Sequence, residues 1–255
     1  MTKIEKTIEK YCKRIHLPYY IDIVKRLSSN FTPIKICVHT STSTGSDSPA
    51  RDYIAGTKRG AMGSALPHFY VDFNEAIQCE HLDSISYHAG NPANIEALSI
   101  ECLQNRIHTI EDDYSEDNTA KLVAVLMKVF NISIDNVVTH TYYVHDDSEV
   151  FANNDIRSTT AVYGKKWCPF YIFRTTDNGL ALQRWKSFKG KIMEYSYILN
   201  HDLNNDGKID EMDAVILSRF LAGWNIEEDK AMDYNEDGKI NEKDYIKLSR
   251  YLTND

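Results

Sequence analysis

The stretch Lys35-Ile36-Cys37-Val38-His39 is a short apolar run that ends in a histidine, a pattern typical of a buried strand. Residues 97–103, with the sequence ALSIECL, alternate as a second strand, and residues 136–140 form a third that also ends in a histidine. Residues 69–73 and 75–79 indicate a hairpin with a tight turn between them. The body of the chain therefore contains several strands spread along its length.

Helical patterns separate these strands. Apolar residues at helical spacing predict helices over residues 4–16 and 119–130. A closing helix is expected around residues 180–192, ending near Glu194. Strands that alternate with helices predict an α/β domain with a mixed central sheet flanked by helices.

The composition suits a medium domain with a small appendage: 255 residues, 42% hydrophobic, with a formal net charge of −8. An acidic balance argues against nucleic acid as the main partner. No apolar stretch approaches the roughly 20 residues that cross a bilayer, so no membrane insertion is expected, and the first residues show no signal peptide. Five scattered cysteines favour free thiols, one of them a candidate metal ligand, over a disulfide framework.

The acidity is concentrated at the C-terminal end. Residues 196–255 hold 14 acidic and 7 basic residues, whereas the rest of the chain holds 23 and 22. This acidic segment contains a repeat with a period of 31 residues. DLNNDGKIDEMDAVILSRFL at 202–221 matches DYNEDGKINEKDYIKLSRYL at 233–252 at twelve of twenty positions.

Each copy of the repeat opens with oxygen-bearing side chains at loop positions one, three and five, followed by a glycine at position six. Oxygen ligands in a flexible loop are typical of an EF-hand-type calcium site, and magnesium fits less well. Position twelve is Asp rather than Glu, and no amphipathic helix runs directly into the second loop, although one leaves each loop. Two Asx-rich turns that cap helices without metal remain the alternative. The expected calcium ligands are Asp202, Asn204, Asp206, Lys208 through its carbonyl, and Asp213, and then Asp233, Asn235, Asp237, Lys239 likewise, and Asp244.

This duplicated loop-helix unit resembles a type I dockerin, a calcium-dependent module that docks enzymes onto cohesins. The resemblance implies a small all-α domain over residues 195–255 with two structural Ca²⁺ ions. The positions beside the loop ends, where dockerins often have small hydroxyl residues, are Glu211-Met212 and Glu242-Lys243 here. A cohesin partner, a cell-wall partner and another copy of the module therefore all stay open.

The body, residues 1–194, resembles over roughly residues 34–194 the type 2 N-acetylmuramoyl-L-alanine amidases of phage endolysins and autolysins, which are related to peptidoglycan recognition proteins. Five elements carry the resemblance, in the order of the family. They are Ile36-Cys37-Val38-His39-Thr40, Ser86-Tyr87-His88-Ala89-Gly90, Leu98-Ser99-Ile100-Glu101, Val138-Thr139-His140 and Lys166-Trp167-Cys168-Pro169.

The resemblance implies that His39, His140 and Cys168 converge on one catalytic zinc ion. Two imidazoles and a thiolate suit zinc, and three protein ligands leave one tetrahedral position for water. Zinc would polarise the scissile carbonyl and lower the pKa of its bound water toward about 7. The alternative is that the two histidines are structural and Cys168 is an inert core cysteine.

Amide cleavage also needs a base for the water and a proton for the departing amine, and Glu101 is the candidate for both roles. Lys166 is expected to stabilise the developing oxyanion. His88 resembles a substrate-contacting position, although a structural role is nearly as well supported. The expected reaction is hydrolysis of the amide between N-acetylmuramic acid and L-alanine in peptidoglycan.

Two other functions compete with this hydrolase. One is a non-catalytic peptidoglycan-recognition protein, but the presence of Cys168 and Lys166 argues against it. The other is a wall-active cargo docked onto a cohesin scaffold, which differs in biology rather than in chemistry. The setting is expected to be the bacterial cell wall, reached either as an endolysin released from the host cytoplasm or as a secreted autolysin whose signal has been removed.

Overall fold

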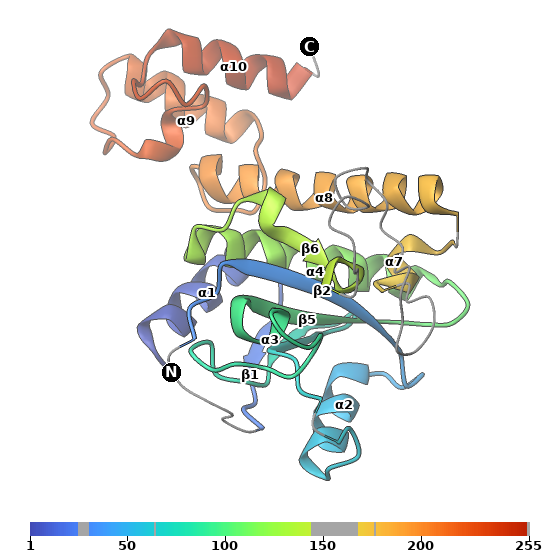
Figure 1. Cartoon of the computed structure of the whole chain (residues 1–255). Coiled ribbons are helices and arrows are strands. Elements are labelled where there is room, and N and C mark those ends of the chain that lie inside the picture. The colour runs from blue at the N-terminus through green and yellow to red at the C-terminus, as the bar shows by residue number, and fades with distance from the viewer. Residues whose placement is uncertain (25–30, 64, 144–167, 176, 254–255) are drawn as a thin grey trace.

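The computed structural model describes residues 1–24, 31–63, 65–143, 168–175 and 177–253, and Figure 1 shows the arrangement of their elements. One sheet lies in the centre of the larger part of the molecule, with helices on both faces. Helices α9 (Glu211–Leu221) and α10 (Glu242–Thr253) form a small unit at the C-terminal end, next to α8 (Asn178–His201), and their Leu217 and Leu248 belong to the same buried cluster as the main core. Among the described helices, none is both long enough and apolar enough to cross a bilayer.

The sheet has six strands in the described residues, in the order β1-β4-β3-β5-β2-β6. The β3–β4 hairpin is antiparallel and every other pairing is parallel, so the predicted mixed sheet is confirmed. The long pair β2 and β5 forms its centre, and the register places His39 directly opposite Glu101. The strands are β1 (Tyr19–Ile21), β2 (Lys35–Thr42), β3 (Phe69–Val71), β4 (Ala76–Gln78), β5 (Ala97–Gln104) and β6 (Val137–Thr139).

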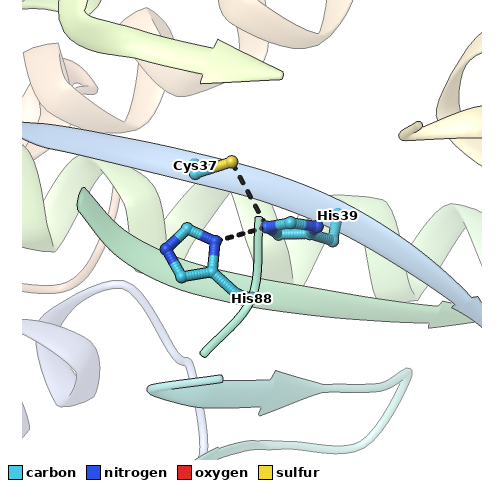
Figure 2. Close-up of side chains that lie close together, drawn as sticks. All are labelled: Cys37, His39 and His88. Atoms are coloured by element: carbon cyan, nitrogen blue, oxygen red, sulfur yellow. Dashed lines mark hydrogen bonds between the residues drawn. The ribbon is translucent and has the colours of Figure 1, made fainter. Parts of the chain in front are cut away.

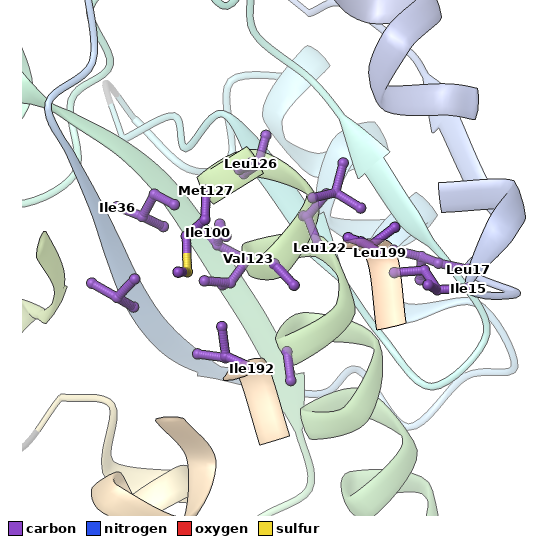
Figure 3. Close-up of a cluster of buried hydrophobic side chains, with 14 of the residues drawn as sticks. Ile15, Leu17, Ile36, Ile100, Leu122, Val123, Leu126, Met127, Ile192 and Leu199 are labelled. Carbon is purple, nitrogen blue, oxygen red and sulfur yellow. The ribbon is translucent and has the colours of Figure 1, made fainter. Parts of the chain in front are cut away.

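Helices α1 (Lys3–Arg14), α4 (Ile110–Phe130) and α8 (Asn178–His201) cover one face of this sheet, and α2 (Pro49–Lys58) lies on the other. The main core forms where even-numbered residues of β2 and β5 meet α4 and α8. Figure 3 shows part of this cluster, with Ile36 and Ile100 against Val123 and Ile192. The shorter helices α3 (Ala93–Glu96), α5 (His140–Tyr143) and α7 (Phe170–Phe173) link the larger elements.

Helix α4 begins at Ile110, nine residues before its predicted start. Its first turns are polar and lack the apolar stripe from which the helix was predicted. Local capping starts the helix instead, since the backbone N–H of Thr109 donates to Asp112 Oδ2 at 2.7 Å. Acidic side chains in the first turn also interact favourably with the positive end of the helix dipole.

Helix α8 was predicted to end near Glu194, and this prediction is wrong because the helix continues to His201. Ile198 and Leu199 continue the buried stripe begun by Trp185 and Ile192, so the packing of the last two turns favours continuation. The helix ends where Asp202 opens the first acidic loop. A domain boundary after residue 194 stays a prediction, and it lies inside this helix.

The C-terminal unit has one long helix after each acidic loop, α9 (Glu211–Leu221) and α10 (Glu242–Thr253). Only a short 3-10 helix, η2 (Lys230–Met232), precedes the second loop, as the sequence indicated. The first loop rests on the end of α1: Arg14 Nη2 donates to the carbonyl of Asp202 at 3.0 Å, and His16 Nε2 lies 2.8 Å from the carbonyl oxygen of Asp206. The small unit therefore contacts the end of α1 through its first loop, and it contacts α8 through Tyr234, whose hydroxyl donates to the carbonyl of His201 at 2.7 Å.

Candidate metal centre and acidic loops

The predicted zinc ligands come from three separate segments that meet beside β2. His39 lies on β2, which is flanked by β5 and β6. Glu101 is its partner on β5, and His140 follows the last residue of β6. Because these strands are parallel, their carboxyl ends reach the same edge of the sheet. Cys168 joins them just before α7, where its carbonyl accepts the N–H of Thr141 at 3.1 Å.

Donor atoms of His39, His140 and Cys168 all lie within 4.8 Å of one another. His39 Nδ1 is 3.8 Å from the Sγ of Cys168, and the rings of His39 and His140 are 4.5 Å apart between centroids. All three side chains are buried, with 2%, 6% and 9% of His39, His140 and Cys168 exposed. Two imidazoles and one thiol at this separation are a suitable donor set for a single tetrahedral zinc ion with one open position.

Glu101 lies at the same place. Its Oε1 is 3.9 Å from His39 Nδ1, and its Oε2 accepts a hydrogen bond from the hydroxyl of Ser41 at 2.9 Å. The side chain of Glu101 is 19% exposed, so water reaches a carboxylate that borders the buried donor set. This arrangement suits an exchange of protons with a solvent molecule at the metal.

The other nitrogen of His39 faces a second group, shown in Figure 2. Its Nε2 is 2.9 Å from His88 Nδ1 and 3.2 Å from the Sγ of Cys37. Burial lowers the pKa of His88 to about 3, so its imidazole is neutral at neutral pH. Cys37, His39 and His88 are themselves close enough to hold an ion, but they share His39 with the first set.

The structure places most, but not all, of the site residues predicted from the sequence close to one another. The structure brings His39, His140, Cys168 and Glu101 together, and His88 lies beside them, half-buried, on the Nε2 side of His39. Lys166 lies outside the described residues. Cys37 and Ser41 were not singled out as site residues, although they sit two residues either side of His39. Side chains two apart on a strand share one face, and this period would have identified both.

The two acidic loops share a set of internal hydrogen bonds. In the first, Asp202 Oδ2 accepts from Gly207 N at 2.8 Å and Asp213 Oδ2 accepts from Asp210 N at 2.8 Å. In the second, Asp233 Oδ2 accepts from Gly238 N and Asp244 Oδ2 from Asn241 N, both at 2.8 Å. Each loop is therefore folded around its first and twelfth carboxylates.

The twelfth carboxylates, those of Asp213 and Asp244, are fully buried at 0% exposure. Burial raises the pKa of Asp213, and the negative charge of Asp202 raises it further. Gathering buried carboxylates is unfavourable unless a cation offsets their charge. The oxygen-only donors of these loops fit calcium.

Comparisons with known proteins identify the families of the two parts of the chain. Residues 30–170 match the family model described as N-acetylmuramoyl-L-alanine amidase, and residues 200–253 match the model described as dockerin type I domain. A comparison with curated protein sequences finds no match.

Solved structures share the fold. The catalytic domain of XlyA is 26% identical with a TM-score of 0.50, and the match covers 69% of this chain and 99% of that one. A mutant endolysin from Bacillus subtilis matches at 24% identity and a TM-score of 0.51, with the same coverage of both chains. The PlyG catalytic domain matches at 23% identity and a TM-score of 0.51, over 71% of this chain and 96% of that one. At their lower identity, the last two support the fold alone.

Proposed function

Because this chain belongs to the N-acetylmuramoyl-L-alanine amidase family and carries a C-terminal type I dockerin domain, we propose that it is a zinc-dependent peptidoglycan hydrolase with a calcium-dependent docking module. The bond cleaved is the amide between N-acetylmuramic acid and L-alanine. The observation that carries the zinc proposal is the convergence of His39, His140 and Cys168 to within 4.8 Å.

His39, His140 and Cys168 would hold the zinc ion, which when bound would supply Lewis-acid polarisation of the scissile carbonyl and a lowered pKa of water. Glu101 would take the proton of the attacking water on its carboxylate and deliver it to the departing amine. The Ser41 hydroxyl, 2.9 Å from Glu101 Oε2, would hold the carboxylate in place and leave Oε1 toward His39. Lys166 is proposed to stabilise the oxyanion, and His88 to lie at the edge of the substrate groove.

For the dockerin domain we propose two structural Ca²⁺ ions and a cohesin-type partner. Calcium would be held by the oxygen donors of residues 202–213 and 233–244, whose buried twelfth carboxylates support the assignment. A cell-wall component is the second candidate, because Glu211-Met212 and Glu242-Lys243 replace the small hydroxyl residues often found there. A pull-down with a panel of cohesins in calcium and in chelator decides between the two partners.

The test of the zinc proposal is Cys168→Ser, with Cys102→Ser as its matched control. Cys102 is also fully buried and lies next to Glu101 in sequence, but its thiol interacts with Thr119 on the opposite face of the sheet. Cys168→Ser should lose zinc, measured by elemental analysis, and should no longer release dye from labelled cell walls. Cys102→Ser should keep both, and undiminished lysis by Cys168→Ser would refute the ligand assignment.

A non-catalytic recognition protein is the competing function. It would bind cell walls without releasing soluble fragments, whether or not a zinc chelator is present. The hydrolase should release fragments bearing new L-alanine amino termini, and chelation should stop the release. End-group analysis of digested walls therefore separates the two functions.

A further inference from the structure

His88 connects the proposed zinc ligand His39 to a backbone carbonyl. Its Nδ1 is 2.9 Å from His39 Nε2, and its Nε2 is 3.2 Å from the carbonyl oxygen of Ala93. The backbone N–H of His88 donates to Asn94 Oδ1 at 3.0 Å, which holds the residue against the same short helix. Figure 2 shows the His88 ring beside the far nitrogen of His39.

The carbonyl at the end of this chain determines where the protons lie. A carbonyl has no hydrogen to donate, so the 3.2 Å contact with Ala93 is a hydrogen bond when His88 Nε2 carries the proton, and the carbonyl of Ala97 is a second acceptor for the same ring. Neutral imidazole has one N–H, which leaves His88 Nδ1 with a lone pair and makes it an acceptor. His39 Nε2 must then donate to it, and the lone pair of His39 is on Nδ1. That nitrogen is the one that faces Cys168, at 3.8 Å from its Sγ.

We propose that His88 is a positioning residue that selects the metal-binding tautomer of His39, with the proton on Nε2 and the lone pair directed at the zinc site. The inference rests on the proposed zinc site and extends it by one residue. A metal-bound histidine generally donates its second ring N–H to a neighbouring acceptor, which fixes the tautomer and the ring orientation. Here a neutral imidazole, itself oriented by the carbonyl of Ala93, provides that acceptor.

The thiol of Cys37 is a potential donor that would favour the opposite tautomer of His39, so a substitution of Cys37 is the control. Its Sγ lies 3.2 Å from the same His39 nitrogen. If the thiol donated its proton to Nε2, the His39 proton would sit on Nδ1 and block metal binding. The link from His88 to Ala93 excludes this arrangement, because the lone pair on His39 Nε2 would then face the lone pair on His88 Nδ1. The sulfur is instead a second, weaker acceptor for the same N–H.

The direct test measures the tautomer in the full-length, metal-free protein. Ring ¹⁵N labelling of the nine histidines and long-range ¹H–¹⁵N spectra distinguish an Nε2–H from an Nδ1–H imidazole, and His39→Gln identifies the His39 signals. The wild type and Cys37→Ser should show the Nε2–H tautomer at His39. His88→Leu, which has no acceptor, should show a mixture. His88→Asn should restore the wild-type form because its side-chain oxygen can replace the Nδ1 acceptor.

Zinc affinity gives the second readout, by competition with a chromophoric chelator. His88→Leu should bind zinc about 10- to 100-fold more weakly than the wild type, as for other outer-shell partners of metal ligands. His88→Asn and Cys37→Ser should stay near the wild-type affinity. An Nδ1–H tautomer in the wild type, a His88→Leu protein with unchanged tautomer and affinity, or a Cys37→Ser protein that loses the tautomer would overturn the role of His88. A wild-type chain that binds no zinc would overturn the zinc site itself, and the metal-free spectra keep the two failures separate.

Discussion

Gly207→Ala tests the contact between the first acidic loop and the amidase domain, and Gly238→Ala is its internal control. The two glycines occupy the same position of the two repeats and both have a left-handed backbone, with φ of +88° and +81°. A methyl group at Gly207 would lie 2.6 Å from the carbonyl oxygen of Arg14 and 2.8 Å from His16 Nε2. At Gly238 no atom lies within 4 Å of the corresponding methyl.

The expected magnitudes follow from this difference. Alanine in the left-handed region costs roughly 1–2 kcal/mol, and both variants bear this cost equally. In Gly207→Ala the loop must also move away from α1, which strains or breaks the hydrogen bonds from Arg14 to Asp202 and between His16 and Asp206. At about 0.5–1.5 kcal/mol each, their loss adds about 1–3 kcal/mol. Gly207→Ala should therefore be the less stable variant by that amount.

Urea unfolding of the full-length variants in saturating calcium measures the difference. Limited proteolysis of the segment between α8 and α9 adds a second readout, because a loop released from α1 should be cut faster in Gly207→Ala than in Gly238→Ala. Equal stabilities and equal cleavage rates in the two variants would show that the first loop does not rest on α1, and would refute the reasoning.

Glu101→Gln should keep its zinc and lower kcat by about 10²- to 10⁴-fold, measured by dye release and elemental analysis; a kcat near that of the wild type would remove Glu101 from proton transfer. Asp206→Ala combined with Asp237→Ala should abolish stabilisation by calcium. In the wild type this stabilisation is about 2.7 kcal/mol per site at a calcium concentration of 100 Kd. A wild-type protein that melts at the same temperature with and without chelator would exclude the calcium sites. Stability should fall as the pH drops from 6.5 toward 4, because burial lowers the pKa of His68 to about 4 and only the unfolded state takes up its proton in this range. His68→Gln should make that decline shallower in urea titrations at stepped pH, and an unchanged slope would contradict this origin.

How much of the site was predictable depends on which interactions are local. The acidic loops follow from the spacing of residues 202–213 and 233–244, since each turn is closed by side chains of its own segment. The start of α4 was missed because a cap at Thr109 and Asp112 produces no apolar stripe, although the pair is visible in sequence as a capping box. The end of α8 was missed because packing of Ile198 and Leu199, rather than a local stop signal, determines where the helix continues.

By itself, the sequence predicted five of the six described strands, missing β1, and the helices α1, α4, α8, α9 and α10, together with the duplicated loops and, through family resemblance, the three candidate zinc ligands. The strands, helices and loops are encoded by residue type and spacing over a few turns of chain, whereas the zinc ligands lie far apart in the sequence and rest on the resemblance. Only the tertiary structure decided that His88 and Cys37 face one nitrogen of His39 while Cys168 and Glu101 face the other, and that the first loop rests on Arg14 and His16. Apart from Cys37, which shares a strand face with His39, these are contacts between segments tens to hundreds of residues apart. Their geometry is set by strand register and by how helices pack on the sheet, and no local pattern records it.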